Sequence, residues 1–214
     1  GLCPHRLRRF PREIWAKVKG MEPERIAALF TQDDGSYLCA RWGRPVAPVI
    51  FGLAEESLAI FRGAIRAGFA HAGHPLAETD PEMGANLMLF VVRDWDELAG
   101  LPDLDALTGQ PGLEARLAAA GSGAGADQYR ILRFDPDGGI RACLMFLRMA
   151  GPLGAAHPAR LAEALVMRAA LSFAREVSPS AEMAALIRAA YDPVLPVAAR
   201  DASHALRLSA RMAA

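Results

Sequence analysis

The 214-residue chain is 52% hydrophobic and 22% charged, which is ordinary usage for a globular protein and argues against wholesale disorder. Its 24 Lys and Arg residues equal its 24 Asp and Glu residues in number, whereas a protein that neutralises nucleic-acid phosphates needs a clear cationic excess. No apolar run approaches the roughly 20 residues that span a bilayer. We therefore expect a folded protein without a nucleic-acid partner or a transmembrane segment.

The first 20 residues carry six Lys and Arg residues against a single acid, Glu13. Chain ends are usually loosely tied down, so we interpret residues 1–20 as a basic arm and residues 21–214 as a single domain. No apolar stretch follows the arginines of the arm, so we expect no signal peptide within it.

A short helix and two extended segments open the domain. Pro23 suits the first turn of a helix, and the apolar residues Ile26 and Phe30 follow it four positions apart. Residues 37–42 and 46–53 are mostly apolar and are expected to be extended, with an interruption at Gly43 and Pro45.

A longer helix follows over residues 54–72. Phe61, Ile65 and Phe69 recur at helical spacing and give this helix one apolar face. Gly73 is placed to end the helix, since glycine adopts the left-handed conformation common at helix C-termini.

Residues 87–92 are apolar at every position, which is typical of a strand covered on both faces. Successive side chains of a strand point to opposite faces. We therefore expect Leu89 and Phe90 to lie against two different covers of the sheet.

The next segment, residues 93–114, holds six acids and one arginine and is expected to form two or three short helical turns. We interpret residues 122–125 as a flexible linker. Residues 129–134 and 140–147 flank a turn of Asp, Pro, Asp and two glycines at 135–139, which predicts an antiparallel β-hairpin.

Helices fill the chain beyond residue 151. Apolar periodicity predicts them over residues 158–173, 180–191 and 198–211, with no further strand. Their apolar stripes are wider than a solvated helix needs, so we expect this third of the chain to close over the sheet within the same domain. The order of elements predicts an α+β fold with a mixed or antiparallel sheet, a β-hairpin, flanking helices and a helical C-terminal third.

The three cysteines, Cys3, Cys39 and Cys143, are widely spaced and form no CxxC pair, which argues against zinc ribbons and thioredoxin-type redox motifs. Two alternatives remain for the last two. Cys39 and Cys143 could form a disulfide in an oxidising compartment, or each could be a small buried residue of a strand.

Catalytic motifs are missing from the sequence. There is no HExxH, no GxSxG nucleophile elbow and no P-loop, so we assign no catalytic residue and no cofactor. His71, His74 and Glu78 lie close together in the sequence and, with Glu163, are the candidates for a metal site. The alternative is that the two histidines lie at the end of a helix, near its last carbonyls. We favour the second interpretation and predict no bound metal.

Three short stretches, residues 41–46, 85–87 and 186–195, resemble an uncharacterised proteobacterial family, a domain of unknown function with members described as lipoproteins. The resemblance covers roughly residues 38–196. It implies a zincin-like layout and an exported, periplasmic or lipoprotein location. Members of the family often carry Glu-Glu-x-x-Gln on the helix after the hairpin. Only Glu163 could correspond here, so the resemblance carries no catalytic site over.

The missing motifs and the resemblance together favour a non-catalytic, exported or envelope-associated domain that binds a protein or peptide partner. The alternative is a metal-dependent hydrolase, a degenerate zincin-like peptidase with ligands from His71, His74, Glu78 and Glu163.

Overall fold

The computed structural model describes residues 20–119 and 127–213. Apart from Gly20, the predicted basic arm at residues 1–20 lies outside the described residues, as does the predicted linker at residues 122–125. Helix makes up 43% and strand 21%, with one mixed four-stranded sheet and one small antiparallel pair. These proportions confirm the predicted α+β class.

The main sheet has its four strands in the spatial order β2 (Pro48–Phe51), β3 (Leu87–Val92), β5 (Ile140–Arg148) and β4 (Gln128–Phe134). The first three of these strands are parallel, and β4 pairs with β5 in an antiparallel hairpin. The runs expected at residues 46–53, 87–92, 129–134 and 140–147 each hold a strand of this sheet, and the predicted hairpin is confirmed. The expected extended segment at residues 37–42 holds only the two-residue strand β1 (Cys39–Ala40), which lies outside this sheet.

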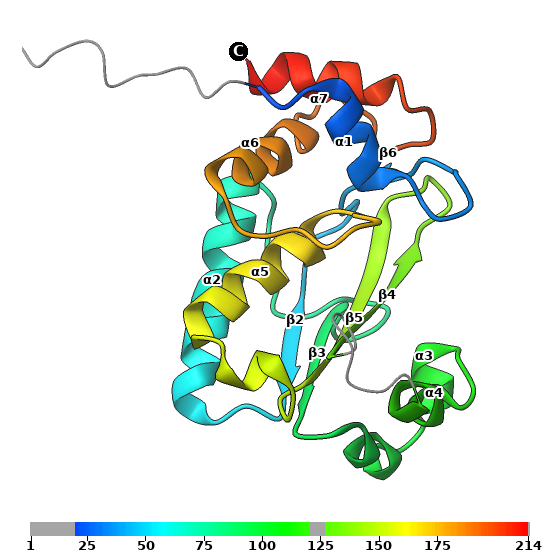
Figure 1. The fold of residues 1–214 in the computed structure, drawn as a ribbon, viewed down its shortest axis with the longest axis vertical. Coiled ribbons are helices and arrows are strands. Elements are labelled where there is room, and N and C mark those ends of the chain that lie inside the picture. Colours follow the sequence, from blue (N-terminus) through cyan, green and yellow to red (C-terminus); the bar gives the residue numbers. More distant parts are fainter. Residues whose placement is uncertain (1–19, 120–126, 214) are drawn as a thin grey trace, which may run out of the picture.

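Two sets of helices cover the two faces of this sheet (Figure 1). On one face lie α2 (Glu55–Ala72) and α5 (Pro158–Ala170); on the other lie η2 (Trp95–Gly100), α3 (Leu104–Thr108) and α4 (Leu113–Ala119). Leu89 packs with the first set and Phe90 with the second, and both are buried. The expected alternation of these two side chains is confirmed.

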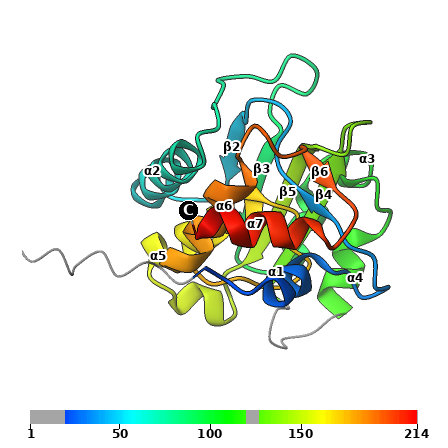
Figure 2. The same ribbon diagram turned by 90° about the horizontal axis from the view of Figure 1, so that it is seen from above.

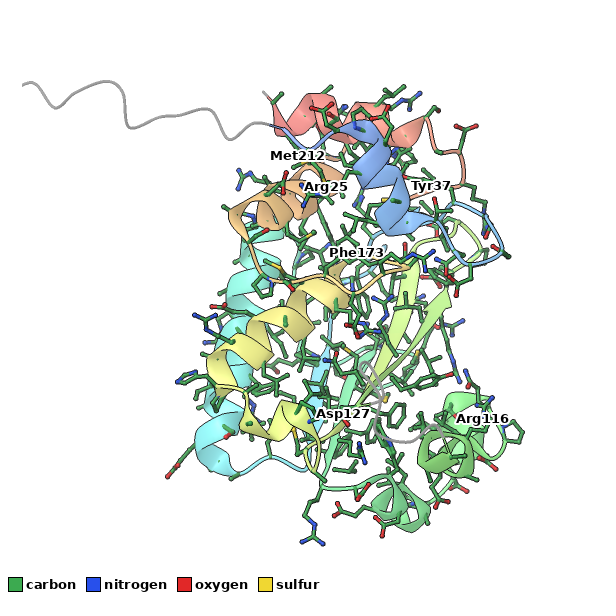
Figure 3. The ribbon with its side chains drawn as sticks, in the orientation of Figure 1. Arg25, Tyr37, Arg116, Asp127, Phe173 and Met212 are labelled. Atoms are coloured by element: carbon green, nitrogen blue, oxygen red, sulfur yellow. The ribbon has the colours of Figure 1, made fainter. Side chains whose placement is uncertain are left out.

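Three further helices gather at one end of the sheet, namely α1 (Pro23–Phe30), α6 (Ala181–Ala190) and α7 (His204–Met212) (Figures 1 and 2). Phe30 of α1 stacks on Phe173 with ring centroids 5.0 Å apart, and Phe173 lies beneath α1 in Figure 3. A short 3-10 helix, η3 (Pro152–Ala155), leads into α5. Of the C-terminal helices, only α5 lies over the sheet, so the expected closure of the C-terminal third over the sheet holds for α5 and is wrong for α6 and α7.

The predicted helix over residues 198–211 is wrong in its first part. Residues Ala198–Ala199 form strand β6, which pairs antiparallel with β1 (Cys39–Ala40), and α7 begins only at His204. A run of small residues fits a helix and a strand equally well. The partner that selects the strand lies more than 150 residues earlier in the chain, beyond the reach of local periodicity.

The predicted helix over residues 158–173 also ends early, because α5 stops at Ala170. Ser172 then lies beside Ala40, and its hydroxyl accepts a hydrogen bond from the Ala40 N–H at 2.7 Å.

The guanidinium of Arg130 in β4 donates to the carbonyls of Arg168, Leu171 and Phe173. Burial lowers the pKa of Arg130 to about 10, and the carbonyls at the C-terminus of α5 stabilise its charge.

Local sequence signals set the end of α2, as predicted, and the start of α6. Gly73 adopts φ +70° after α2, and its N–H donates to the carbonyl of Ala70. Ser180 is the N-cap of α6 and accepts a hydrogen bond from the Met183 N–H at 3.0 Å. None of the described helices is long and apolar enough to cross a membrane.

Candidate functional site

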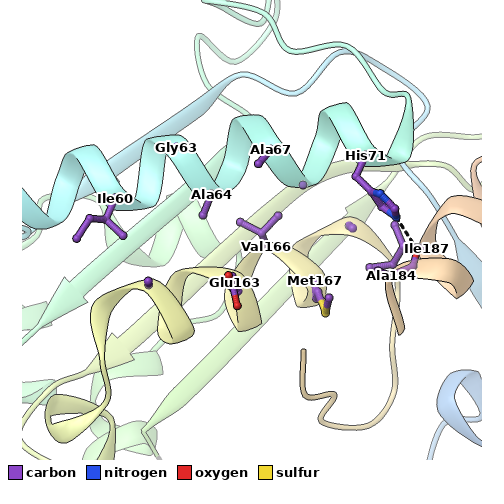
Figure 4. A pocket seen from close by; sticks show the side chains of 13 residues that line it. Ile60, Gly63, Ala64, Ala67, His71, Glu163, Val166, Met167, Ala184 and Ile187 are labelled. Carbon is purple, nitrogen blue, oxygen red and sulfur yellow. Dashed lines mark hydrogen bonds between the residues drawn. The ribbon is translucent and has the colours of Figure 1, made fainter. Parts of the chain in front are cut away.

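A groove of about 420 Å³ runs along the outer side of the α2–α5 pair and ends at α6 (Figure 4). Its volume falls in the range of ligand-binding clefts. Most of its lining is apolar and small: Ile60, Gly63, Ala64, Ala67, Gly68, His71, Ala159, Glu163, Val166, Met167, Ala170, Ala184 and Ile187.

The residue sizes on α2 explain why the groove exists. Between Ile60 and His71, every residue of α2 that lines the groove is Gly or Ala, so no large side chain of α2 fills the space between the two helices on their outer side. Gly68 also lets α5 approach closely, since a Cβ at this position would lie 2.3 Å from Cγ1 of Val166. The same small residues therefore bring the helices together and leave a trough above them.

Two titratable side chains line the groove. His71 lies at the end near α6, where its Nε2 is 2.9 Å from the carbonyl oxygen of Ala184 (Figure 4). Glu163 projects from α5 and is exposed. The hydrogen bond to Ala184 ties α2 to α6 and closes one end of the groove.

The structure separates the four residues considered as metal ligands. His71 and Glu163 line the groove, whereas Glu78 lines a different pocket beside β2. The Nε2 of His74 is 2.8 Å from the carbonyl oxygen of Arg44, and burial lowers the pKa of this imidazole. In residues 20–119 and 127–213, no three His, Cys, Asp or Glu side chains come together as a metal site.

The thiols of Cys39 and Cys143 are free, so the disulfide alternative is wrong. Both cysteines are buried, as the other interpretation held. Burial raises the pKa of each thiol to about 12. The reactive form of cysteine is the thiolate, so neither residue is suited to act as a nucleophile.

A buried polar cluster that the sequence analysis missed lies at the amino ends of β2 and β3. Asn86 is fully buried; its amide accepts from the Ala47 N–H at 2.8 Å and donates to Asp80 at 3.0 Å. Arg44 binds both oxygens of Asp135, at 2.8 and 3.1 Å, and approaches Asp80 at 3.4 Å. The cluster ties the loop before β3 to the hairpin turn.

The charge of Asp80 is stabilised within this cluster. Burial alone would raise its pKa, but the backbone N–H groups of Glu82 and Met83, with Asn86 and Arg44, outweigh burial and lower it. Arg44 joins this loop to the hairpin turn, and Asn86 joins it to the segment before β2, so the cluster is structural. Two of its members, Arg44 and Asn86, lie in the stretches that carry the family resemblance.

A second polar contact lies at the carboxyl ends of the strands, where open α/β sheets commonly place their ligands. Arg148 of β5 donates to Asp127 at 2.7 Å and approaches Asp94 at 3.5 Å. Asp127 is buried and lies at the lower end of the sheet in Figure 3. The ion pair joins the end of β5 to the start of β4, so its charges are used within the fold. The apolar groove is therefore the better candidate site.

Comparison with family models, with curated proteins and with solved structures finds no match for this chain. The resemblance to the uncharacterised proteobacterial family therefore stays a prediction, as do the zincin-like layout and the exported location that it implies.

Proposed function

We propose that this protein is a non-catalytic binding domain, and that its groove between α2 and α5 receives the apolar face of an amphipathic helix from a protein or peptide partner. The observation that carries this proposal is the lining of the groove, which is apolar and small along α2 and open to solvent above α5.

A helix suits the groove better than an extended segment does. The floor of the groove is formed by two helices, and a third helix packs well into the trough between such a pair when small residues allow a close approach. From Ile60 to His71 the trough is about 16 Å long at 1.5 Å per residue, which is three turns of a bound helix. Binding a helix in an apolar groove is a recurring mode of peptide recognition.

The exposed residues of the groove support a binding role. Ile60 is 39% exposed at the end away from α6, and Met167 is half-buried on the α5 side. Met is a flexible side chain that adapts to different apolar partners. Glu163 and His71 are placed to contact polar groups at the edges of a bound helix.

The test is a selection from a displayed library of amphipathic helices of about 14 residues, long enough to span the groove at 1.5 Å per residue. The affinity of each selected peptide is then measured for the wild type and for Ala67→Trp, which fills the middle of the groove from an exposed position. We expect Ala67→Trp to weaken binding by about 10-fold or more, the loss expected when apolar contact is replaced by a steric block.

The matched control is Ala59→Trp, an equally large change at an exposed position of α2 outside the groove lining. It should leave the affinity within about 2-fold, since Ala59 is not among the residues that line the groove. Selected peptides that bind both variants as they bind the wild type would show that the groove is not the binding site.

A further inference from the structure

The other side of α2 borders a second surface, the outer edge of strand β2. This strand is the last of the sheet, so among residues 20–119 and 127–213 one side of its backbone has no partner strand from Pro48 to Phe51. A pocket of about 570 Å³ lies along this edge, between β2 and α2.

The chain itself begins to pair with this edge and then leaves it. Val46 forms a parallel bridge with Leu76: its N–H donates to the Pro75 carbonyl at 3.1 Å, and its carbonyl accepts from the Ala77 N–H at 2.9 Å. Backbone groups of alternate residues point to the same side of a strand. Ile50, four residues beyond Val46, therefore points its N–H and carbonyl outward at the open part of the edge.

The two edges of the sheet differ in their protection. The opposite edge strand, β4, carries Arg130 and Arg133, both of which donate to carbonyls of neighbouring segments, and it has an irregularity between Arg133 and Phe134. Charged residues and bulges are the usual means of guarding an edge strand. In β2 only Pro48, which has no N–H to donate, serves this purpose.

The charges around the open edge indicate the kind of partner. Arg62 and Arg66 lie one turn apart on α2, line the edge pocket and are exposed. Glu78 is the third charged residue of this lining, so two cations face one acid there. In the part of the chain that the structure describes, neither guanidinium has an ion-pair or hydrogen-bond partner. They are placed above the space that an added strand would occupy.

We propose that the outer edge of β2 binds a short, extended, acidic peptide segment, which continues the pairing begun by residues 75–77 and places a carboxylate against Arg62 and Arg66. Pairing at a sheet edge supplies main-chain hydrogen bonds, and flanking side chains select the sequence. The exposed ring of Phe51, 47% accessible at the end of the strand, offers an apolar contact to the same segment.

A second copy of this chain is the less suitable occupant. Two β2 edges related by a two-fold axis would bring Arg62 and Arg66 of one copy over the same arginines of the other, and like charges across a paired edge are destabilising. The arginines therefore favour an acidic partner and oppose self-pairing.

The test uses two labelled peptides, acetyl-Val-Glu-Val-Glu-Val-amide and its counterpart with lysine in place of glutamate, titrated into the full chain at low salt. Fluorescence anisotropy gives the affinity, and amide shifts in NMR spectra locate the binding. We expect the acidic peptide to bind at least about 10-fold more tightly than the basic one, with the Ile50 amide among the largest shifts. Raising the salt should weaken binding, as for any exposed charge contact.

The variant is Arg62→Glu/Arg66→Glu, which should reverse the preference between the two peptides. Arg207→Glu, a single exposed change on α7 at the far end of the molecule (Figure 1), should leave the preference as in the wild type. Four results would each overturn the inference. In the peptide titrations, these are equal binding of the two peptides, no binding of the acidic peptide at millimolar concentration, and amide shifts that avoid β2. The fourth is a dimer in sedimentation that the double variant enhances. The groove between α2 and α5 is untouched by these changes, so its test is decided separately.

Discussion

The two covers of the central sheet are built in different ways. The cover of η2, α3 and α4 consists of short elements whose large side chains, Trp95, Leu98 and Leu113, are buried against the sheet. The cover of α2 and α5 consists of two long helices that present large residues to the sheet, and α2 presents mostly small ones to the groove. The difference teaches that a groove can form where one side of a helix has no large side chains, while large side chains on its other side pack against the sheet.

The largest expected effects concern the strand between the two covers. Leu89→Ala should lower the free energy of unfolding by about 2–5 kcal/mol and Phe90→Ala by about 3–5 kcal/mol, since each leaves a cavity under a different cover. Denaturant unfolding monitored by circular dichroism measures both. A loss below about 0.5 kcal/mol for either variant would mean that its cover is absent in solution.

Two glycines of α2 line the same groove and differ in how closely α5 approaches them. Gly68→Ala should cost about 1–3 kcal/mol, because the new methyl group would overlap Val166. Gly63→Ala should instead stabilise the protein by about 0.5–1 kcal/mol, since nothing lies within 4 Å of the new Cβ and alanine favours the helix. Thermal unfolding of the two variants measures both changes in stability. Equal effects of the two substitutions would refute the described packing of α2 on α5.

The polar cluster at the amino ends of the strands should make stability depend on acid. The pKa of Asp80 in the folded protein lies below its ordinary value of 3.8, so its contribution is present above that pH and is lost as the pH falls through the lowered value. The free energy of unfolding should therefore fall on acidification below about pH 4, and Asp80→Asn should flatten that dependence. An unchanged pH profile in Asp80→Asn would contradict the structural role of this carboxylate.

The smallest expected effect concerns the buried cysteines. With Cys3 replaced by Ser, the native protein should react with a thiol reagent such as dithionitrobenzoate only as fast as it unfolds, because Cys39 and Cys143 are buried and their thiols stay protonated. Reaction of either thiol within seconds under native conditions would show a reactive cysteine that the structure does not contain.

Much of the fold could be predicted from the sequence, because its strands and helices carry strong local patterns. The apolar run at residues 87–92, the turn at residues 135–139 and the spacing of Phe61, Ile65 and Phe69 each identify their element. The pairing of β1 with β6 could not be predicted, since Ala198 and Ala199 have no pattern of their own and take the strand form from a distant partner.

The candidate site was harder to predict than the fold. His71 and Glu163, two of the four candidates for metal ligands, do share a groove, but the left-handed turn at Gly73 directs His74 to Arg44 and away from them. The groove itself depends on how α2, α5 and α6 meet in space. Its one local signal was the series of small residues at positions 63, 64, 67 and 68, which a search for apolar stripes passes over.

The most direct test of the binding role compares the two covers in one NMR experiment. A selected helical peptide is titrated into protein with labelled methyl groups, and shifts and contacts to the peptide are mapped. We expect contacts from the peptide to the methyl groups of Ala67, Val166 and Met167 in the groove, with Leu98 and Leu113 of the opposite cover unchanged. Contacts at Leu98 or Leu113, with none in the groove, would contradict the proposal that the α2–α5 groove binds the partner.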